Sequence, residues 1–203
     1  MWVSNFDGSI ERVAPTGDRV LARLALVGRP AFTAVAFGLV WSVNPERAVC
    51  TVNPATNAQA GPPIPVGDDV DDLSVAHGAI WVTTYNDGLL ARIEPSTRAV
   101  TWTKKLGGRA AGVLAASEGG VLVSLYDRGV VERVDPGKRS CHPHRPSRRR
   151  AKVGHRGGRR LWVANQGSGT VSRISLSTPS GVTRESAKLV DAQTVFLVPA
   201  VGG

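Results

Sequence analysis

The sequence predicts an all-β protein built from repeats, and three observations support this class. Short runs rich in β-branched and aromatic residues, such as "AIWVTTY" from 79 and "LLARIEP" from 89, are separated by turn signals such as Asn-Asp-Gly. Runs of this kind recur about every forty residues. No long segment shows the apolar period of a helix. We therefore expect strands joined by tight turns along the chain.

Five segments carry the repeat at nearly constant spacing. They read "WVSNFDGSIERV" from 2, "WSVNPERAVCTV" from 41, "WVTTYNDGLLARI" from 81, "LVSLYDRGVVERV" from 122 and "WVANQGSGTVSRI" from 162. Their first residues lie 39, 40, 41 and 40 positions apart and are Trp2, Trp41, Trp81, Leu122 and Trp162. A second marker follows each of them, at Pro15, Pro54, Pro95, Pro136 and, as a leucine, at Leu176. Matches at such regular spacing indicate one structural unit repeated along the chain.

Each repeat predicts four strands in a fixed order. An apolar run such as "AFTAVAFG" or "DLSVAHG" comes first, and the second strand begins near the lead residue. The third strand follows a polar hairpin, and an outer run such as "AVTWTKKL" follows a Pro-Ser-Thr turn. A four-stranded antiparallel unit of this length cannot bury its face alone, and stacked copies form a β-propeller. A parallel β-helix is the rival architecture, but its repeats are usually shorter.

Two repeats also resemble known propeller families. "LWVANQGSGTVSRI" from 161 resembles the YVTN-type repeat of bacterial propellers, and "FDGSIERVAPTGD" from 6 is similar to the units of the streptogramin lyases, the virginiamycin B lyase family. The similarity covers the chain except for about 138–160 and the tail after about 178. Because these families usually have six or seven blades, the resemblance implies that five repeats form an incomplete ring, a fragment of a larger propeller.

The two ends of the chain fit this expectation. The first repeat opens on its second strand at Trp2, and the last ends near "TVFLVPAVGG" from 194, which we interpret as an outermost strand. Residues 1–203 are thus expected to form a single propeller domain. Its open edge is expected to be unpaired or to close as a strained five-bladed ring.

The net charge of +9 lies in one segment. Nine lysines and arginines and no acidic residue lie between Arg139 and Arg160, and the rest of the chain holds 16 basic and 16 acidic residues. This segment replaces an outer strand and an apolar strand without changing the repeat spacing. Its Arg, Pro, His and Gly content is typical of GC-rich DNA read out of frame, so compensated frameshifts are our first hypothesis.

Two alternatives for residues 138–160 remain open. An arginine-rich arm would bind nucleic acid through phosphate contacts, and a solvated loop would have no function. As translated, we expect the segment to be disordered and not to pair as strands. Nucleic acid is therefore not an expected partner unless the arm is genuine.

Composition excludes several other classes. Cys50 and Cys141 form no disulfide framework, and no apolar run approaches the roughly 18 residues of a membrane span. No signal peptide is visible after Met1, so the cytoplasm is the default expectation, with the natural N-terminus expected upstream.

Three groups of residues have ligand-type side chains. Cys141, His142 and His144 match no structural zinc spacing, so we predict no metal site there. His77 occupies a turn slot that Phe37 fills in the preceding repeat, and we interpret it as a surface turn residue. The stretch "GDDVDD" from 67 could hold a hard cation, but it lacks the calcium-loop spacing and is interpreted as a solvated loop.

The candidate binding surface comes from the geometry of a four-stranded meander. The loop between strands two and three and the crossover to the next blade lie at the same end of the sheet, and loops on a rigid scaffold commonly carry function. This rim is expected to present Asn5, Asp7, Arg29, Asp69, Tyr85, Asn86, Asp87, Arg109, Tyr126, Asp127, Asn165 and Gln166. Turn chemistry alone accounts for most of these residues individually.

The function expected from this surface is non-enzymatic binding of a protein or small molecule without a cofactor. The alternative, implied by the resemblance, is a streptogramin lyase or a degraded copy, which would open a macrocyclic lactone by elimination with Mg²⁺. No catalytic residue can be assigned, because no His-and-Glu set of that family matches here residue by residue.

Overall fold

The computed structural model describes residues 1–17, 19–115, 120–135, 137, 140–146, 151–157, 160–175 and 184–188. These residues form β-strands and one short 3₁₀ helix, η1 (Gln166–Ser168), and no α-helix. The chain divides into two compact units, Met1–Lys105 and Leu106–Gly203. The prediction of one domain over residues 1–203 stays a prediction.

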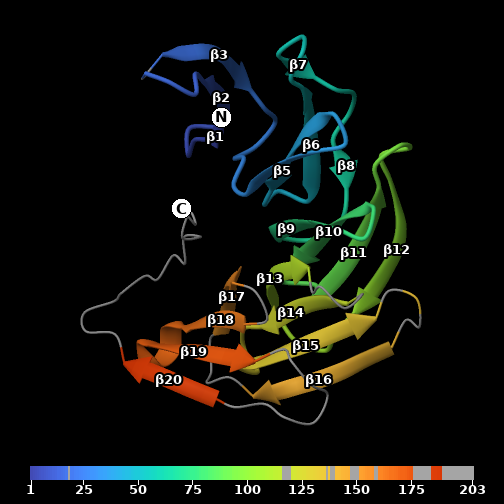
Figure 1. The fold of residues 1–203 in the computed structure, drawn as a ribbon. Helices are drawn as coiled ribbons and strands as arrows, with labels where there is room; N and C mark the ends of the chain where they lie inside the picture. The colour runs from blue at the N-terminus through green and yellow to red at the C-terminus, as the bar shows by residue number, and fades with distance from the viewer. Residues whose placement is uncertain are drawn as a thin grey trace. The chain divides into compact units, whose positions relative to one another are not determined.

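The first unit contains three antiparallel sheets (Figure 1). Sheet A has the order β1-β2-β3, sheet B the order β4-β5-β6-β7 with β8 also on β6, and sheet C the order β12-β11-β10-β9. The strands are β1 (Trp2–Ser4), β2 (Ser9–Val13), β3 (Val20–Ala25), β4 (Thr33–Ala36), β5 (Leu39–Asn44), β6 (Ala48–Asn53), β7 (Ala58–Gln59), β8 (Ile64–Pro65), β9 (Val70–Ala76), β10 (Ala79–Thr84), β11 (Leu89–Glu94) and β12 (Ala99–Lys105). Each sheet is a meander of consecutive strands, as the repeat predicts.

The register confirms the alignment of the repeats. The lead residue of each repeat lies on the second strand, opposite a residue that is arginine in four repeats of five. The pairs are Trp2 with Arg12, Trp41 with Thr51, Trp81 with Arg92, Leu122 with Arg133, and Trp162 with Arg173. Sheet A begins at the second strand of its repeat, also as predicted.

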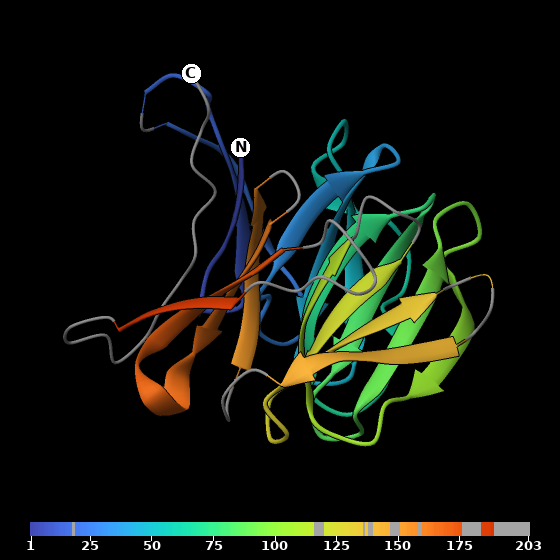
Figure 2. The ribbon, with the colours of Figure 1, turned by 60° about the horizontal axis from the view of Figure 1, so that its bottom comes forward.

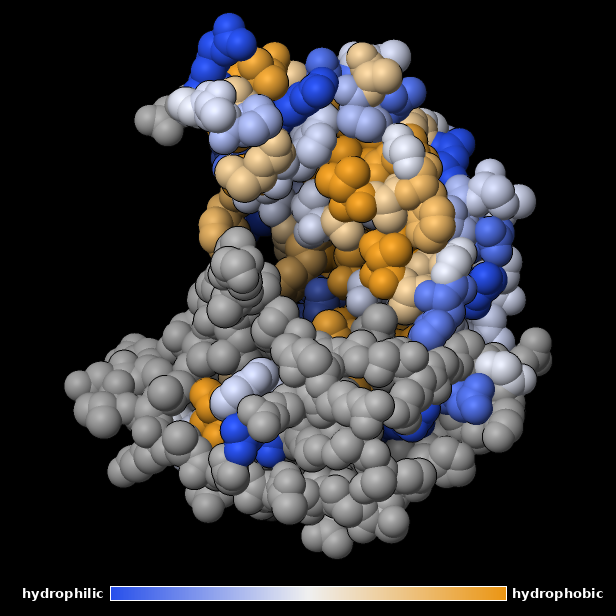
Figure 3. All heavy atoms as spheres, viewed as in Figure 1, coloured by the Kyte–Doolittle hydropathy of each residue, from blue (hydrophilic) through white to orange (hydrophobic). Residues whose placement is uncertain are grey.

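The core of the first unit lies between neighbouring sheets. Trp41 and Val43 of sheet B pack with Ile80, Val82 and Ile93 of sheet C in one buried cluster. A second cluster joins sheet A to sheet B in the same way. Hydrophobic side chains gather over the adjoining parts of sheets B and C, and hydrophilic ones follow the outer edge of sheet C (Figure 3). This burial is how strands that cannot fold alone become stable as a stack.

The turn from the first to the second strand has the same structure in sheets B and C. Phe37 and Gly38 have φ angles of 51° and 75°, and His77 and Gly78 have 48° and 69°. Two successive positive φ angles define the tight hairpin turn that suits twisted strands. The indole of each lead tryptophan then donates to the last residue of the first strand, with Trp41 Nε1 3.0 Å from Ala36 O and Trp81 Nε1 3.1 Å from Ala76 O.

The fourth strand of sheet B is interrupted. β7 and β8 both pair with β6, and the chain leaves the sheet between them at Gly61, Pro62 and Pro63. Proline has no N–H to donate, so two successive prolines cannot continue a ladder on this edge. The four-stranded sheets C, D and E have one continuous outer strand each.

The second unit contains sheets D and E, each with four antiparallel strands (Figure 2). Sheet D has the order β13-β14-β15-β16 and sheet E the order β17-β18-β19-β20. The strands are β13 (Ala110–Ala115), β14 (Val121–Leu125), β15 (Val130–Asp135), β16 (Ser140–Pro146), β17 (Ala151–Gly157), β18 (Arg160–Asn165), β19 (Thr170–Ser175) and β20 (Arg184–Lys188).

The expectation that the basic segment forms no strands is wrong for two parts of it. Ser140–Pro146 pairs with β15 as the outer strand of sheet D, and Ala151–Gly157 pairs with β18 as the first strand of sheet E. The physical reason is that ladders are made by backbone groups, which most residues carry whatever their side chains. The unchanged repeat spacing leaves the right length for both strands. The frameshift hypothesis is untested by this pairing.

The fourth strand of sheet E is β20. The residues from 194 onward, interpreted above as an outermost strand, are not tested by this pairing. Those residues lie outside the described part of the chain.

No helix among the described residues is long and apolar enough to cross a membrane.

Candidate functional site

Hairpins and crossovers meet at one end of each sheet, and backbone hydrogen bonds fix them there. In sheet C, Tyr85 N donates to Asp69 O at 2.7 Å, which ties the β10–β11 hairpin to the β8–β9 crossover. Asp68 N donates to Asp87 Oδ2 at 2.5 Å across the same junction. The structure therefore brings predicted residues Asp69, Tyr85 and Asp87 together, while Asn86 lies exposed at the tip of the hairpin.

The β3–β4 crossover is likewise tied to the hairpins of sheets A and B on either side of it. Leu26 N donates to Gly8 O at 3.0 Å, and Asn44 Nδ2 donates to Val27 O at 2.5 Å. The predicted residue Arg29 lies in this crossover and is exposed. Asn5 Nδ2 donates to Ser9 Oγ at 3.0 Å and stabilises its own hairpin. An Asn or Asp of the hairpin thus anchors the crossover in both sheets B and C.

Asp7 is a rim residue whose pKa is lowered. Ser9 Oγ and Ser9 N donate to Asp7 Oδ1 at 2.6 and 2.9 Å, and these hydrogen bonds lower the pKa of Asp7 below its ordinary value of 3.8. Arg23, which also pairs with Asp7 and Glu11, is a smaller cause. Asp7 is therefore a fixed negative charge at neutral pH.

The rim of the second unit repeats the anchor. Tyr126 N donates to Arg109 O, and Arg109 N donates to Asp127 Oδ1, both at 2.8 Å. Asn165 differs from the prediction, because it is only 1% exposed and its amide donates to Thr170 and Ser172. It stabilises the β18–β19 hairpin from inside. The side chain of Gln166 lies outside the described ones.

A pocket of ≈ 420 Å³ opens on the rim of the first unit. Arg47 of the β5–β6 hairpin, Asp68 of the crossover and Asp87 of the β10–β11 hairpin line it. Arg47 Nε lies 3.5 Å from Asp68 Oδ1, with the two side chains 73% and 44% exposed. A side chain at Gly67 would come within 2.8 Å of Asp87 Oδ2, so glycine permits this close approach.

Sequence reasoning missed Arg47 and Phe6. Arg47 has a φ of 99°, and the signal for it was the hairpin "NPER", which departs from the Asn-Asp-Gly type. Phe6 occupies the fourth position after the lead residue, the slot of Tyr85 and Tyr126 in sister repeats, and is 95% exposed. Three hairpins thus present an aromatic ring at the same position of the repeat.

The other candidate ligand groups do not assemble into a metal site within the described ranges. His77 is exposed at the turn where it was predicted, at the strand end opposite the rim. Cys141, His142 and His144 lie in β16, with side chains outside the described ones. No group of three or more His, Cys, Asp or Glu side chains converges in the part of the chain that the structure describes. No ligand set for the Mg²⁺ of a lyase is assigned among the described side chains, and we derive no step through it.

The fold can be compared with solved structures. No protein-family profile and no curated protein sequence matches the chain. A structure titled "Crystal Structure of Mitotic Checkpoint Complex" matches with a TM-score of 0.81 at 11% identity, over 94% of this chain and 61% of that chain. The WD40 repeats of RRP9 match with a TM-score of 0.77 at 12% identity, over 87% of this chain and 57% of that one. Virginiamycin B lyase from Staphylococcus aureus matches with a TM-score of 0.74 at 12% identity, over 92% of this chain and 65% of the lyase.

These similarities show the class of the fold. The protein is an all-β chain of five propeller-type repeats, as predicted, and it spans 57 to 65% of the length of the structures just named. At 11–12% identity the similarity shows the fold alone and does not carry a family or an activity.

Proposed function

We propose that this protein is a non-enzymatic binding propeller that takes its ligand on the rim of hairpins and crossovers. The observation that carries the proposal is the rim pocket of the first unit, in which Arg47, Asp68 and Asp87 come from three different loops. A ligand in this pocket would contact the cationic donor Arg47 and the anionic acceptors Asp68 and Asp87 at once. Mixed polar groups around a concavity are typical of sites that orient a polar ligand.

The anchoring hydrogen bonds support the proposal through pre-organisation. The bonds Tyr85–Asp69 and Asp68–Asp87 hold two of the three loops in place without a ligand. A loop that is already ordered loses little conformational entropy on binding. The aromatic rings of Phe6 and Tyr85 add rigid contact surface of the kind enriched in protein interfaces. We infer a peptide segment of a partner protein as the ligand class.

The proposal is tested with a displayed peptide library selected on the immobilised protein. Enriched peptides are then measured by calorimetry against Arg47→Ala, Tyr85→Ala and, as a control at the opposite strand end, His77→Ala. We expect losses of ~10-fold or more for the first two variants and no change for the control. Peptides that bind all variants equally, or no enrichment at all, would contradict a rim site.

A further inference from the structure

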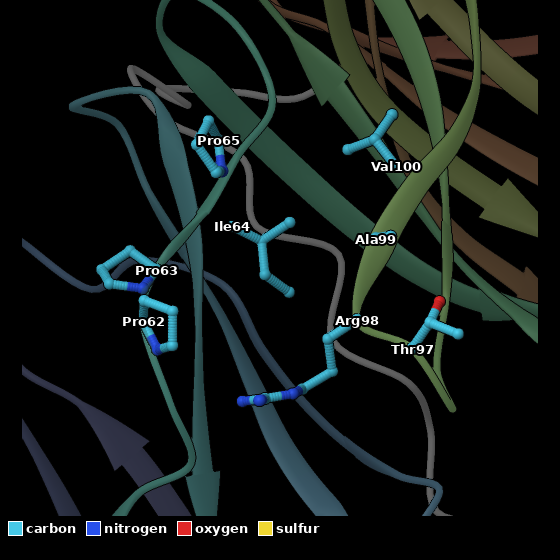
Figure 4. A pocket seen from close by; sticks show the side chains of 8 residues that line it. All are labelled: Pro62, Pro63, Ile64, Pro65, Thr97, Arg98, Ala99 and Val100. Atoms are coloured by element: carbon cyan, nitrogen blue, oxygen red, sulfur yellow. The ribbon is translucent and has the colours of Figure 1, made fainter.

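A second pocket of the first unit lies away from the rim, between the interrupted outer strand of sheet B and the β11–β12 turn of sheet C. Its volume is ≈ 400 Å³, which is within the range of small-molecule sites. Pro62, Pro63, Ile64 and Pro65 form one wall, and Arg98 and Val100 belong to the other (Figure 4). The break in the outer strand of sheet B therefore creates this pocket.

The lining combines one charged side chain with the mostly apolar side chains of prolines, Ile64, Ala99 and Val100. Among the described residues, Arg98 is the only charged one that lines the pocket. Its side chain extends from the β11–β12 turn toward Pro62 on the opposite wall (Figure 4). A side chain at Gly61 would come within 2.4 Å of Arg98 Nη1, so this glycine makes room for the guanidinium.

The Arg98 guanidinium lacks an acceptor where it is buried. Nη1 is inaccessible to solvent and has no hydrogen-bond partner among the described residues. A buried cationic donor without an acceptor loses its hydration without compensation. An anionic group beside the guanidinium would supply the opposite charge that the described residues do not provide.

At the neighbouring border between sheets A and B, by contrast, an arginine does have hydrogen-bond acceptors. There, Arg12 of β2 reaches the β6–β7 turn of sheet B, where Nη1 donates to Pro54 O at 2.9 Å and to Asn57 Oδ1 at 3.2 Å. At the border between sheets B and C, Thr51 stands in the position of Arg12, and Arg98 in that of Asn57. At the border between sheets B and C the arginine is therefore on the turn of sheet C and not on the strand of sheet B. Its Nη1 makes neither of the two hydrogen bonds that Arg12 makes.

The backbone at Arg98 adds a second, independent observation. Asn57 and Arg98 have φ angles of 51° and 54°, in the left-handed region that asparagine tolerates better than arginine. Strained positions persist where the surrounding structure holds them, and they are frequent at ligand sites. At this turn the chain has an arginine where the sister turn has the better-suited asparagine.

We propose that this pocket binds a small organic carboxylate with an apolar body. The carboxylate pairs with the guanidinium of Arg98, since the two groups are matched in charge and geometry. The apolar body lies against the proline and isoleucine wall. The site is separate from the rim, so this proposal does not depend on the proposed function.

Benzoate is the probe for the carboxylate, and benzyl alcohol is its neutral counterpart. Both are titrated into the full chain at constant ionic strength, with binding followed by ligand-detected NMR. We expect benzoate to bind the wild type ~10-fold or more tightly than benzyl alcohol, since a charge-assisted hydrogen bond is lost in the alcohol. Equal binding of the two probes, or no binding of benzoate, would overturn the proposal.

The variants Arg98→Asn and Arg19→Gln separate a binding role from a structural one. Arg98→Asn restores the residue of the sister turn, so we expect an unchanged or higher denaturation midpoint together with a loss of ~10-fold or more in benzoate affinity. Arg19→Gln removes an exposed charge of the same unit and should leave benzoate binding unchanged. A destabilised Arg98→Asn variant that still binds benzoate would make Arg98 a structural residue and overturn the proposal.

Discussion

Asp7 and Ser9 form a self-contained unit in which two hydrogen bonds to one oxygen hold a carboxylate ionised. Because the folded pKa of Asp7 lies below the unfolded value near 3.8, its contribution to stability is complete above that value. The contribution is lost as the pH falls through the lower, folded pKa. We expect Ser9→Ala to raise the pKa of Asp7, measured by NMR titration of the side-chain carboxyl.

The control for this prediction is Arg23→Gln, which removes the smaller, Coulombic cause. Its effect on the pKa of Asp7 should be smaller than that of Ser9→Ala, because the Arg23–Asp7 pair is exposed and screened by solvent. A larger effect from Arg23→Gln would show that the ion pair, and not the hydrogen bonds, keeps Asp7 ionised.

Asp87 combines an anchoring role with a place in the rim pocket. Its carboxylate accepts from Asp68 N at 2.5 Å, so Asp87→Ala leaves a part-buried backbone donor without its partner. We expect the free energy of unfolding to fall by ~1–2 kcal/mol, measured by urea denaturation. Asn86→Ala, at the exposed neighbour, should change it by less than ~0.5 kcal/mol. Equal losses in the two variants would mean that the hairpin as a whole, and not this bond, sets the stability.

The lead tryptophans act at the scale of the strand pair. Trp81 is buried, donates to Ala76 O at the end of the first strand, and meets the Trp102 ring edge-on with centroids 5.8 Å apart. Trp81→Phe removes the hydrogen bond and part of the buried volume, so we expect a loss of ~2–4 kcal/mol in the free energy of unfolding.

Trp162 is the matched control for Trp81, because it holds the same position in its repeat and is only half-buried, with Arg173 over its ring at 5.9 Å. We expect Trp162→Phe to lower the free energy of unfolding by less than ~1.5 kcal/mol, in the same denaturation experiment. If the two variants lose the same free energy of unfolding, burial of the indole does not determine how much the lead residue contributes to stability.

The strands could be predicted because the signals for them are local. Alternating runs, Gly-containing turns and the spacing of the lead residues each depend on a few neighbouring residues, and the structure has the strands in that order. Arg47 and Arg98 could not be predicted as pocket residues in this way. Their roles depend on which loop lies across from them in the next sheet, and a one-dimensional pattern carries no such information.

The same reasoning explains the error over the basic segment. Side-chain composition argued against strands in 138–160, but pairing depends on backbone groups and on the edges that β15 and β18 offer. The prediction of the rim residues from the sequence had a different limit. Turn chemistry and binding favour the same residue types, and only the structure distinguishes the buried Asn165 from the exposed Asn86.

At the scale of the whole molecule, charge and fold are carried by different residues. The net charge of +9 comes from one segment, yet parts of that segment complete sheets D and E through backbone pairing. The basic residues of β17 are therefore expected to be replaceable without loss of the fold. Lys152→Thr with Arg156→Thr tests this, because threonine fits a strand better than lysine and lessens the repulsion between like charges.

We expect this double variant to keep its free energy of unfolding within ~0.5 kcal/mol of the wild type or to exceed it. Val163→Thr on the adjacent β18, where the valine is fully buried, should instead lose ~1 kcal/mol or more. The double variant also tests the nucleic-acid hypothesis for the segment. If both cations neutralise phosphates, the slope of log affinity for duplex DNA against log salt becomes shallower by about 1.8. An unchanged slope would exclude these two residues from any phosphate contact, and a loss of stability above ~2 kcal/mol would show that their side chains, and not the backbone alone, hold β17 in sheet E.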